Sequence, residues 1–570
     1  MKILSLHCDY IKFKPVKKAI REPEQISKDD EKGKEIKECL VILTSIQKAD
    51  ENNSGLIVSK LAENIKDISS QVNCKKIVLY PYAHLATDLA SPQNAMKILS
   101  DAEAELKKGK FEVYHAPFGY YKEFELKCKG HPLSELSRQI SVEETLGKTE
   151  IKEEYDPKQL LRSISKTKLD TTKLKDNDHR IIGQKLDLFS FHDVAPGMVF
   201  WHNNGLVIYN ELISFLREEH RKAGYLEVST PFVMDKKLWQ ISGHWEKYKE
   251  NIFLTKYEGR DFAVKPMNCP GGILVFKSTP KSYNNLPLRM AELGVVHRQE
   301  LSGVLAGLFR VIKFTQDDAH IFCTENQLEK EIAGIMEMID LVYKKFGFDY
   351  HVELSTRPQK KIGEEILWDK AEKILEAVLK EKGIKFKVNT GDGAFYGPKI
   401  DFHIKDSLAR TWQCATIQLD FAMPQRFDLE YVGEDNKTHR PVMLHRVVYG
   451  SLERFIGILL EHTNGNLPVW LAPIQVRVLS FTDRNKKKTE EVFELLKEKG
   501  IRSDIDLKDS TVNDKVRNAE LEKIPYTILI GDKEEQNNTI ALRCKGKKPE
   551  FGVKIEDFVL RIKEEISERK

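Results

Sequence analysis

Three arginines lie in sequence contexts that suit the binding of phosphate groups. They are Arg298 in VHRQE, Arg310 in LFRVIKFTQDDAH and Arg454 in YGSLERFIGILLE. A guanidinium group forms two parallel charge-assisted hydrogen bonds to a phosphate and stays protonated at neutral pH. A single arginine among the 91 basic residues more often forms a surface salt bridge. The three positions therefore predict a phosphate site only when they are taken together.

One cysteine and two histidines form a second candidate set. Cys269, His320 and His445 are separated by 51 and 125 residues, a spacing that carries no metal signature. The ordinary interpretation of each is a buried free thiol or a hydrogen-bonded core histidine. None of the eight cysteines forms a CxxC pair, so the sequence predicts neither a disulfide framework nor a zinc ribbon. From the residues alone, a core role and a ligand role both stay open.

The arginines belong to a pattern that resembles the three motifs of class II aminoacyl-tRNA synthetases. Gly224 and Pro231 in GYLEVSTP are similar to motif 1, residues 298–314 are similar to motif 2, and Gly450 with Glu453-Arg454 is similar to motif 3. Each motif is short and degenerate. Their order and separation along the chain together indicate the class.

Longer motifs narrow the resemblance to the threonyl-tRNA synthetase family. Residues 183–475 contain MNCPGG, FTQDDAHIF, GDGAFYGPKIDF, TWQCATIQLDF, YVGEDN, MLHRVVYGSLERF and WLAPIQV. The resemblance implies a class II catalytic core built on an antiparallel sheet flanked by helices, and a homodimer formed through motif 1. It also implies activation of L-threonine with ATP and Mg²⁺ to threonyl-adenylate, followed by transfer to tRNA(Thr).

The resemblance assigns ATP contacts to the residues of motifs 2 and 3. Arg298 would bind the α-phosphate, Phe314 would stack on adenine with Glu300 beside it, and Arg310 and Arg454 would hold the γ-phosphate. Attack of a carboxylate on the α-phosphorus places extra charge on the phosphoryl oxygens, which the guanidinium groups and Mg²⁺ would stabilise. Without the resemblance, Phe314 would equally be a core aromatic residue.

The same resemblance implies that Cys269, His320 and His445 bind one Zn²⁺ per subunit. Three protein ligands and one open position are the usual form of a zinc ion that contacts substrate. Threonine and valine are nearly isosteric, and a site that ligates the hydroxyl and amino groups excludes valine far better than a plain pocket does. Asp318 would accept the proton of the threonine hydroxyl.

Further residues are expected around the amino acid. The resemblance implies that the pocket and the reacting atoms are surrounded by Met267, Gln316, Gln413, Gln418, Tyr396, Lys399 and His244. His244 would assist transfer to the tRNA ribose, with Lys399 as a second candidate; local packing beside Trp245 is the alternative for His244. One position departs from the family, because Gly272 stands where a histidine is usual, which removes an imidazole close to the site.

A zinc site of this kind does not exclude serine, which lacks only a methyl group, so a second, hydrolytic site is expected. Residues 1–145, with LHCDYI, YPYAHLA, APFGYYK and KGHPLSELSR, resemble the archaeal threonyl-tRNA synthetase editing domain, which is similar to D-aminoacyl-tRNA deacylases. The resemblance places His84, Tyr121, Lys122 and Glu135 around the seryl-adenosine end of mischarged tRNA. His84 would bind substrate, Lys122 would orient the ester or water, and Glu135 would order Lys122. An ordinary surface ion pair is the alternative for the last two.

The C-terminal residues, from LAPIQVRVLSF to TIALRCKGKK, resemble the class IIa anticodon-binding domain. Arg517, Glu534 and Arg543 match positions that contact the anticodon in that family. Asp509 stands where an asparagine is common in that family, so this position departs from the pattern. Reading unstacked bases requires a few donors and stacking planes more than a broad positive field.

Hydrophobic patterns indicate the elements that position these residues. Residues 1–145 alternate β-like runs (KILSLHCD, CLVILTSI, KKIVLYPY) with the amphipathic NSGLIVSKLAENIKDISSQV, which predicts an α/β domain. Residues 146–182 are polar and charged and are predicted to be a linker. Residues 183–471 are predicted to be the catalytic domain. Residues 472–570, with VRVLSF, KKTEEVFELLKEKG and YTILIG, predict a third, α/β unit. The predicted fold class is therefore multidomain α/β and α+β.

Composition sets outer limits on these interpretations. The 570 residues suit three to five domains, and 41% hydrophobic with 31% charged residues excludes a disordered or collagenous chain. The formal net charge of +4 gives no sign of a nucleic-acid partner. No apolar run has the length of about 18 residues that a membrane helix needs, and no secretory signal is evident. We expect a cytoplasmic protein in a reducing compartment with no membrane partner.

Two other functions remain open. One is a non-catalytic synthetase paralogue that binds RNA, and the retention of Arg298, Arg310 and Arg454 argues against it. The other is a class IIa synthetase for serine or proline, and the Cys269 and His320 positions, together with His445, argue against that.

Overall fold

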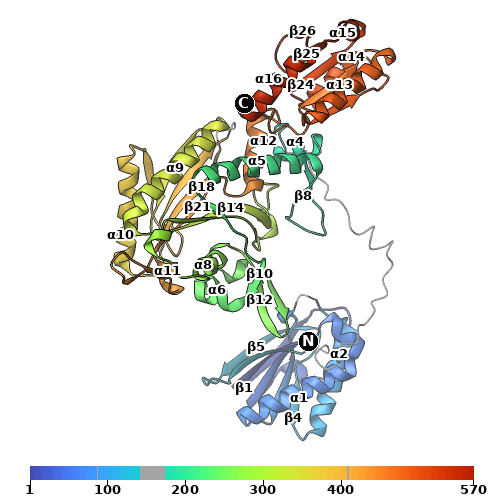
Figure 1. The fold of residues 1–570 in the computed structure, drawn as a ribbon. Helices are drawn as coiled ribbons and strands as arrows, with labels where there is room; N and C mark the ends of the chain where they lie inside the picture. The colour runs from blue at the N-terminus through green and yellow to red at the C-terminus, as the bar shows by residue number, and fades with distance from the viewer. Residues whose placement is uncertain (28, 87, 141–171, 173, 407–409) are drawn as a thin grey trace. The chain divides into compact units, whose positions relative to one another are not determined.

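The chain was analysed as a computed structural model, shown in Figure 1. The structure describes residues 1–27, 29–86, 88–140, 172, 174–406 and 410–570. These residues belong to two compact units, Met1–Glu154 and Tyr155–Lys570. Most of the predicted linker, residues 146–171 and 173, lies outside the described residues. Among the described residues, no helix combines the length and the hydrophobicity needed to cross a membrane.

The first unit contains one mixed sheet with two helices on one face (Figure 1). Its elements are β1 (Lys2–Lys18), β2 (Lys34–Ser45), α1 (Ser54–Val72), β3 (Lys76–Pro81), α2 (Pro92–Lys108), β4 (Glu112–His115), β5 (Tyr120–Cys128) and β6 (Glu135–Gln139). The strand order is β4-β3-β2-β1-β5, and β6 pairs with β1 beyond the end of β5. Strands β2, β3 and β4 are parallel, whereas β1 is antiparallel to its three neighbours. The predicted α/β fold of this region is confirmed.

Helix α1 illustrates why this sequence folds in this way. Ile57, Leu61, Ile65 and Ile68 recur at helical spacing and lie in the core between the helices and the sheet. The helix ends where Asn73 adopts the left-handed conformation, with φ of 51°. The local pattern therefore fixes both the buried face and the end of the helix.

The second unit is built on an eight-stranded sheet. Its strands are β9 (Leu226–Glu227), β13 (Leu288–His297), β14 (Lys313–Cys323), β15 (Tyr350–Ser355), β16 (Phe386–Asn389), β17 (Lys399–Lys405), β18 (Thr411–Asp420) and β21 (Val442–Val447). The order is β16-β15-β17-β18-β21-β14-β13-β9. All pairs from β15 to β13 are antiparallel, and only the two edge pairs are parallel. This confirms the predicted antiparallel core.

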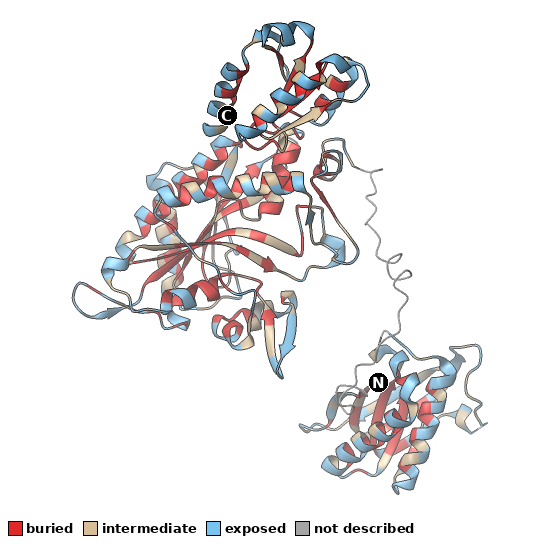
Figure 2. Cartoon of the chain, turned by 45° about the vertical axis from the view of Figure 1, so that its right-hand side comes forward, coloured by how far each residue is buried: buried red, intermediate tan, exposed pale blue. Residues whose placement is uncertain are grey.

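Helices cover both faces of this sheet, and Figure 2 shows buried residues along the strands and on the inner sides of the helices. One face forms a large apolar core with α5 (Asn203–Lys222), α9 (Leu328–Lys345), α10 (Glu365–Glu381) and α12 (Leu452–Thr463). On the other face, a smaller core includes residues of α6 (Lys236–Ser242), α8 (Cys269–Lys277) and α11 (Ala422–Arg426). The candidate site described below lies on this second face.

Smaller elements complete the part of the chain around the eight-stranded sheet. They are α4 (His179–Lys185), β7 (Phe189–Ser190), β8 (Phe200–Trp201), β10 (Val233–Asp235), α7 (His244–Tyr248), β11 (Leu254–Tyr257), β12 (Arg260–Val264), β19 (Tyr431–Val432) and β20 (Thr438–His439). Helix α4 begins inside the predicted linker, and its first residue, His179, is buried.

The C-terminal residues form a separate sheet with its own apolar core. The elements are β22 (Val476–Ser480), α13 (Lys486–Glu498), β23 (Ser503–Asp506), α14 (Val512–Leu521), β24 (Tyr526–Ile530), α15 (Asp532–Asn537), β25 (Ile540–Cys544), β26 (Glu550–Val553) and α16 (Ile555–Ser567). The strand order β23-β22-β24-β25-β26 is parallel over the first three strands. The predicted α/β unit, including the helix in KKTEEVFELLKEKG, is confirmed.

Candidate active site

Four neighbouring strands carry predicted site residues in one row across the sheet. Lys399 on β17 pairs with Gln418 on β18, Gln418 pairs with His445 on β21, and His445 pairs with His320 on β14. Residues that lie directly opposite each other in antiparallel strands point to the same face. Asp318 precedes His320 by two residues and therefore shares that face. The strand register thus brings together residues that are far apart in the sequence.

Cys269 completes a cluster with two members of this row. The candidate ligand atoms of Cys269, His320 and His445 all lie within 4.8 Å of one another, and all three residues are buried. Cys269 is the first residue of α8, which lies over this face of the sheet. One thiol and two imidazoles are a donor set that suits Zn²⁺.

The surroundings of the cluster fit a bound cation. Nε2 of His320 is buried and has no hydrogen-bond partner among the described residues, which a metal bond would satisfy. Nε2 of His445 lies 2.8 Å from Oδ2 of Asp420, a contact that orients the ring and leaves its other nitrogen for a ligand role. Burial raises the pKa of the Cys269 thiol well above its ordinary value and lowers the pKa of His320 to about 4.

Two further features shape the space beside the cluster. Nδ2 of Asn268 donates to Oδ2 of Asp318 at 3.1 Å, which holds the carboxylate next to the metal candidates. A Cβ atom at Gly272 would lie 3.2 Å from Nδ1 of His320. Gly272, the position at which the sequence departs from the expected motif, therefore leaves room beside this imidazole.

A β-bulge turns Gln413 toward the same face. The register of β17 and β18 shifts between Phe402 and His403, and such a shift redirects a side chain. Nε2 of Gln413 donates to Oδ1 of Asp401 at 2.5 Å, and Nζ of Lys399 lies 2.8 Å from Oδ2 of Asp401. Asp401 thus joins two predicted site residues, although the sequence analysis gave it no role.

The three arginines of motifs 2 and 3 lie close enough together to act on one another electrostatically. Nε of Arg454 donates to the carbonyl oxygen of Phe309 at 3.0 Å, and Nε of Arg310 donates to Glu300 at 3.1 Å. Burial lowers the pKa of Arg454, and the positive charges of Arg310 and Arg298 lower it further. A group of guanidinium cations that weaken one another's charged state is a favourable place for a polyanion.

Arg298 and Phe314 form the wall next to this group. The guanidinium carbon of Arg298 lies 5.1 Å from the centre of the Phe314 ring, and Nε of Arg298 donates to the carbonyl oxygen of Pro266 at 3.2 Å. Phe314 is only partly buried, so it is not a fully enclosed core residue. An aromatic face beside cationic groups suits a nucleobase attached to phosphates.

His244 is fully buried between Met267 and the loop of Tyr396. Its Nε2 lies 2.9 Å from the Met267 sulfur, its Nδ1 lies 2.8 Å from Oγ of Ser242, and its ring centre is 6.2 Å from that of Tyr396. Burial lowers the pKa of His244 to about 3, so the imidazole is neutral at neutral pH. Packing beside Trp245 alone does not describe this environment.

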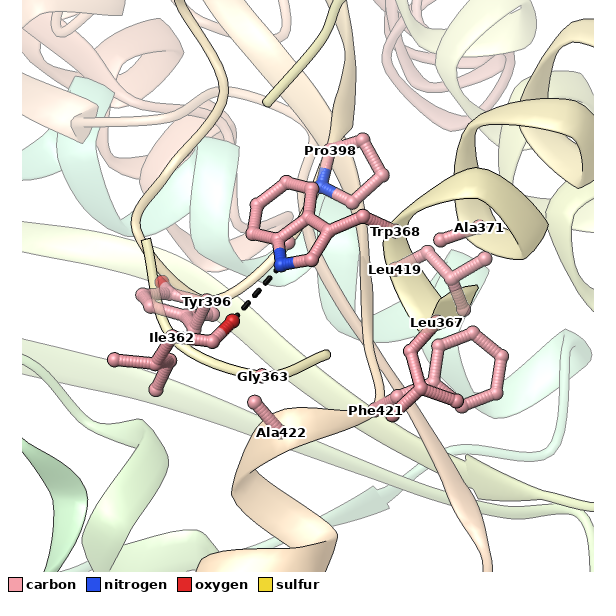
Figure 3. Close-up of a pocket in the computed structure, with 11 residues that line it drawn as sticks. Ile362, Gly363, Leu367, Trp368, Ala371, Tyr396, Pro398, Leu419, Phe421 and Ala422 are labelled. Atoms are coloured by element: carbon pink, nitrogen blue, oxygen red, sulfur yellow. Dashed lines mark hydrogen bonds between the residues drawn. The ribbon is translucent and has the colours of Figure 1, made fainter. Parts of the chain in front are cut away.

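An apolar pocket behind Tyr396 supports its loop, as Figure 3 shows. Nε1 of Trp368 on α10 donates to the carbonyl oxygen of Ile362 at 2.8 Å, and the Ile362 amide donates to the carbonyl oxygen of Phe395 at 2.8 Å. Gln418 donates to the carbonyl oxygen of Gly397 at 3.0 Å. These bonds fix the segment that carries Tyr396 from both sides. Gln316 lies on β14 opposite Gly294, and it shares a face of the sheet with Asp318 and His320 on the same strand.

The residues predicted for editing lie on three elements of the first unit. His84 is on the short 3₁₀ helix Ala83–Leu85, Tyr121 and Lys122 are the second and third residues of β5, and Glu135 is the first residue of β6. Nζ of Lys122 donates to the carbonyl oxygen of Pro117 at 2.8 Å and lies 4.9 Å from the centre of the Tyr80 ring. Burial lowers the pKa of Lys122 to about 8.

The prediction that Glu135 pairs with Lys122 is wrong. Lys122 is opposite Pro15 of β1, whereas Glu135 is opposite Leu6. Nine residues of strand correspond to about 30 Å, so Glu135 neither orders Lys122 nor forms a surface ion pair with it. The carboxylate that acts on the pKa of Lys122 is Glu24, which raises it.

Glu24 belongs to a cavity near Lys122 that sequence reasoning missed. The cavity has a volume of about 260 Å³ and is lined by residues that include Pro81, His115 and Phe118. His115 lies between two carboxylates, 2.6 Å from Glu24 and 2.7 Å from Glu103, and the bond to Glu24 is the main cause of its raised pKa. No motif flagged Glu24, because its partner His115 lies 91 residues away along the chain.

The predicted anticodon residues lie on three elements of the C-terminal sheet region. Arg517 is on α14, Glu534 on α15 and Arg543 on β25. Arg517 is exposed, and Arg543 is half-buried. The Glu534 carboxylate accepts the amide of Gly531 at 3.2 Å, so it caps the start of its own helix.

Three segments of the chain match known sequence families. Residues 1–140 match the archaea-specific editing domain of threonyl-tRNA synthetase. Residues 253–463 match the class II tRNA synthetase core domain for G, H, P, S and T. Residues 475–565 match an anticodon-binding domain.

Individual proteins show the same likeness. The chain is 54% identical over 396 residues to the threonine–tRNA ligase of Acetivibrio thermocellus, covering 69% of this chain and 62% of that protein. It is 53% identical over 395 residues to that of Carboxydothermus hydrogenoformans, covering 68% and 62%. The chain thus spans about 62% of the length of these curated relatives. A crystal structure described as the RNA-binding domain of threonyl-tRNA synthetase from Cryptosporidium parvum matches with a TM-score of 0.67 and 41% identity, covering 68% of this chain and 98% of that one.

Proposed function

Because the chain belongs to the threonyl-tRNA synthetase family, we propose that it activates L-threonine with ATP and Mg²⁺ to threonyl-adenylate and transfers the threonyl group to tRNA(Thr). The observation that carries the proposal is the proximity of two sets of groups, since Arg298 acts electrostatically both on Arg454 and on Cys269. One set is the arginines Arg298, Arg310 and Arg454, and the other is the buried cluster of Cys269, His320 and His445. A triphosphate needs the first set, and discrimination between threonine and valine needs the second.

In this proposal the arginines and their neighbours bind ATP. Arg298 contacts the α-phosphate, Arg310 and Arg454 contact the γ-phosphate, and Phe314 stacks on adenine beside Glu300. Positioned guanidinium groups stabilise the charge that develops on the phosphoryl oxygens while the threonine carboxylate attacks. Arg454 is held by backbone carbonyl oxygens of Phe309 and Gln413, so it needs little reorganisation when ATP binds.

The proposed metal ligands are Cys269, His320 and His445, with Asp420 orienting His445. A zinc ion bound there would supply a Lewis acid that ligates the amino and hydroxyl groups of threonine. Asp318, held by Asn268, accepts the hydroxyl proton. Met267, Gln316, Gln413, Gln418 and Tyr396 form the rest of the amino-acid pocket.

For the transfer step, we place His244 and Lys399 near the tRNA ribose. The imidazole of His244 is neutral at neutral pH and is able to accept a hydrogen bond, whereas Lys399 is paired with Asp401 at 2.8 Å. Lys399 therefore acts mainly as a fixed positive charge, and His244 contributes a neutral imidazole that hydrogen-bonds the ribose hydroxyl.

We also propose a homodimer formed through the motif 1 region. Leu226, Phe232 and Val233 are 58%, 56% and 47% exposed. Large apolar side chains that are exposed within one short stretch of sequence favour a protein interface. A second copy of this chain is the partner that the family implies.

The other proposals concern the outer domains and the location. Residues 1–145 hydrolyse mischarged seryl-tRNA(Thr) with His84, Tyr121 and Lys122, and residues 472–570 bind the anticodon through Arg517, Glu534 and Arg543, while residues 183–471 form the catalytic domain. The cavity beside Lys122 and the lowered pKa of its amine support the first assignment. A cytoplasmic location stays a prediction.

The test is amino-acid-dependent exchange of pyrophosphate into ATP by the full chain, with zinc content measured on the same sample. We expect exchange with threonine, weak exchange with serine and none above background with valine, at about one zinc per chain. Exchange that depends on proline, or on serine more than on threonine, would reassign the substrate. No exchange with any amino acid, together with RNA binding, would support a non-catalytic paralogue.

A further inference from the structure

His179 lies in the predicted linker but is 1% exposed, and both of its ring nitrogens have partners. Its Nδ1 lies 2.7 Å from Oε1 of Glu461, a residue of α12 that is 2% exposed. The backbone amide of Leu308 donates to its Nε2 at 3.0 Å. Because an amide only donates, Nε2 must be the acceptor, and Nδ1 must carry the proton that the Glu461 carboxylate receives.

These hydrogen bonds indicate a structural role for three residues whose spacing would also suit a metal ion. Asp178, His179 and Glu461 have candidate ligand atoms within 4.8 Å of one another. However, each nitrogen of His179 is already used, and Glu461 also accepts the His179 backbone amide at 3.1 Å and a bond from Arg410. The group therefore connects α4 and α12 to the segment that contains Leu308.

The segment that His179 contacts is a tight turn of motif 2. The amide of Phe309 donates to the carbonyl oxygen of Ala306 at 2.9 Å, and the amide of Ala306 donates to that of Arg310 at 3.2 Å. Gly307 has φ of +52°, and a Cβ atom there would lie 2.3 Å from Nε2 of His179. The turn and the imidazole are thus in close contact, and only glycine allows it.

This turn is connected directly to two of the arginines proposed to bind ATP. Arg310 is its last residue, and the carbonyl oxygen of Phe309 accepts Nε of Arg454 at 3.0 Å. The Phe309 ring lies 4.2 Å from the His179 ring and 4.3 Å from the Trp412 ring, measured between centres. A shift of the turn would move both guanidinium groups together.

We propose that His179 and Glu461 are positioning residues for ATP binding: they hold the Ala306–Arg310 turn so that Arg310 and Arg454 point at the triphosphate. The inference rests on the proposed function, because it takes the two arginines as ATP ligands. His179 touches neither ATP nor amino acid; it acts through the Leu308 amide and the Phe309 ring. Small displacements of such groups are costly, since an error of about 1 Å reduces rates by up to about 100-fold.

The test compares two substitutions of His179 that keep a polar side chain. His179→Gln places a carbonyl oxygen near the position of Nε2 and keeps an acceptor for the Leu308 amide, whereas His179→Asn is too short to reach it and keeps only the contact with Glu461. We expect the dissociation constant for ATP with Mg²⁺, measured by calorimetry on the full chain, to rise by at least about 10-fold for Asn and by less than about threefold for Gln. Arg454→Ala gives the reference for a lost ligand.

Lys185→Ala, an exposed change on the same helix, is the matched control and should bind ATP as the unchanged chain does. In threonine-dependent exchange, the Asn variant should raise KM for ATP and leave KM for threonine within about twofold. Equal ATP affinity of the Asn and Gln variants would overturn the inference, as would an unchanged chain that binds no ATP. An unchanged chain that binds ATP but lacks threonine-dependent exchange would defeat the proposed function alone, and the ATP affinities would still decide the role of His179.

Discussion

On the eight-stranded sheet, four adjacent strands carry Lys399, Gln418, His445 and His320 in one row across the strands. In the N-terminal unit, the single strand β1 pairs with Lys122 near one end and with Glu135 near the other. In the first case, pairing across the sheet joins residues that are far apart in the sequence. In the second case, the length of one strand separates two residues that are only 13 positions apart in the sequence.

The difference shows what decides whether two motif residues can act together. Antiparallel pairing brings side chains within about 5.5 Å across strands, and it does so whatever the sequence separation. Along a strand, each residue adds about 3.3 Å. Proximity between residues of different strands therefore follows from the register of the strands, and a short separation in the sequence does not guarantee it.

The largest effect on activity is expected at Cys269, the residue of α8 that lies beside His320 and His445. Cys269→Ser removes the thiolate from the cluster with His320 and His445, and we expect loss of bound zinc and a fall of at least about 1000-fold in threonine-dependent exchange. Elemental analysis and the exchange assay on the same sample measure both quantities.

The control for this prediction is Cys323→Ser. Cys323 is as buried as Cys269 and lies three residues after His320, but it belongs to the apolar core on the opposite face. The Cys323→Ser variant should have a lower thermal stability and should still bind zinc. If the Cys269 variant kept both its zinc and its threonine-dependent exchange, His320 and His445 would be packing residues and not metal ligands. The contrast with the N-terminal unit would then fail.

Local sequence patterns predicted a good part of this architecture, and tertiary contacts account for what they missed. The helix α1 follows from its own spacing of apolar residues and its end at Asn73. The contact of Gln413 with Asp401 depends on a bulge that no periodicity announces. His179 was assigned to the linker because its neighbours are polar, yet its burial depends on Glu461, 282 residues away. Local sequence patterns therefore do not predict the role of a residue when that role depends on a partner far away in the sequence.

The second prediction concerns Lys122 and sharpens the contrast inside the N-terminal unit. Lys122→Met should reduce hydrolysis of seryl-tRNA(Thr) by at least about 10-fold, because it removes a partly desolvated amine from the proposed site. In the unchanged chain, the acetylation rate of Lys122, followed by peptide mass spectrometry, should level off above about pH 8. The rate at ordinary lysines should keep rising to about pH 10.4.

Two carboxylate variants test the distance argument. Glu24→Gln should shift the Lys122 midpoint to lower pH, since Glu24 raises the pKa of this amine. Glu135→Gln should leave the midpoint unchanged, because about 30 Å of strand separates the two residues. A shift caused by Glu135→Gln would place the two residues together, and the contrast between the two regions would fail.

The smallest effect is expected on the opposite face of the eight-stranded sheet, where His220 contacts the strand that carries His445. Nη2 of Arg446, the next residue on β21, lies 2.5 Å from Nε2 of His220, and the His220 ring stacks on Tyr225. Burial, helped by Arg446, lowers the pKa of His220 to about 2.

In the unfolded chain, His220 has a pKa of about 6.5 and binds a proton below that pH, whereas in the folded chain it stays neutral. The free energy of unfolding therefore falls as the pH falls. Between pH 7.5 and pH 6 this one group should lower the free energy of unfolding by about 1 kcal/mol. His220→Gln keeps an acceptor for Arg446 and should reduce the pH dependence by that amount in urea unfolding at the two pH values. An identical pH dependence in both proteins would mean that His220 has the same pKa in the folded and the unfolded chain, so that neither burial nor Arg446 acts on it.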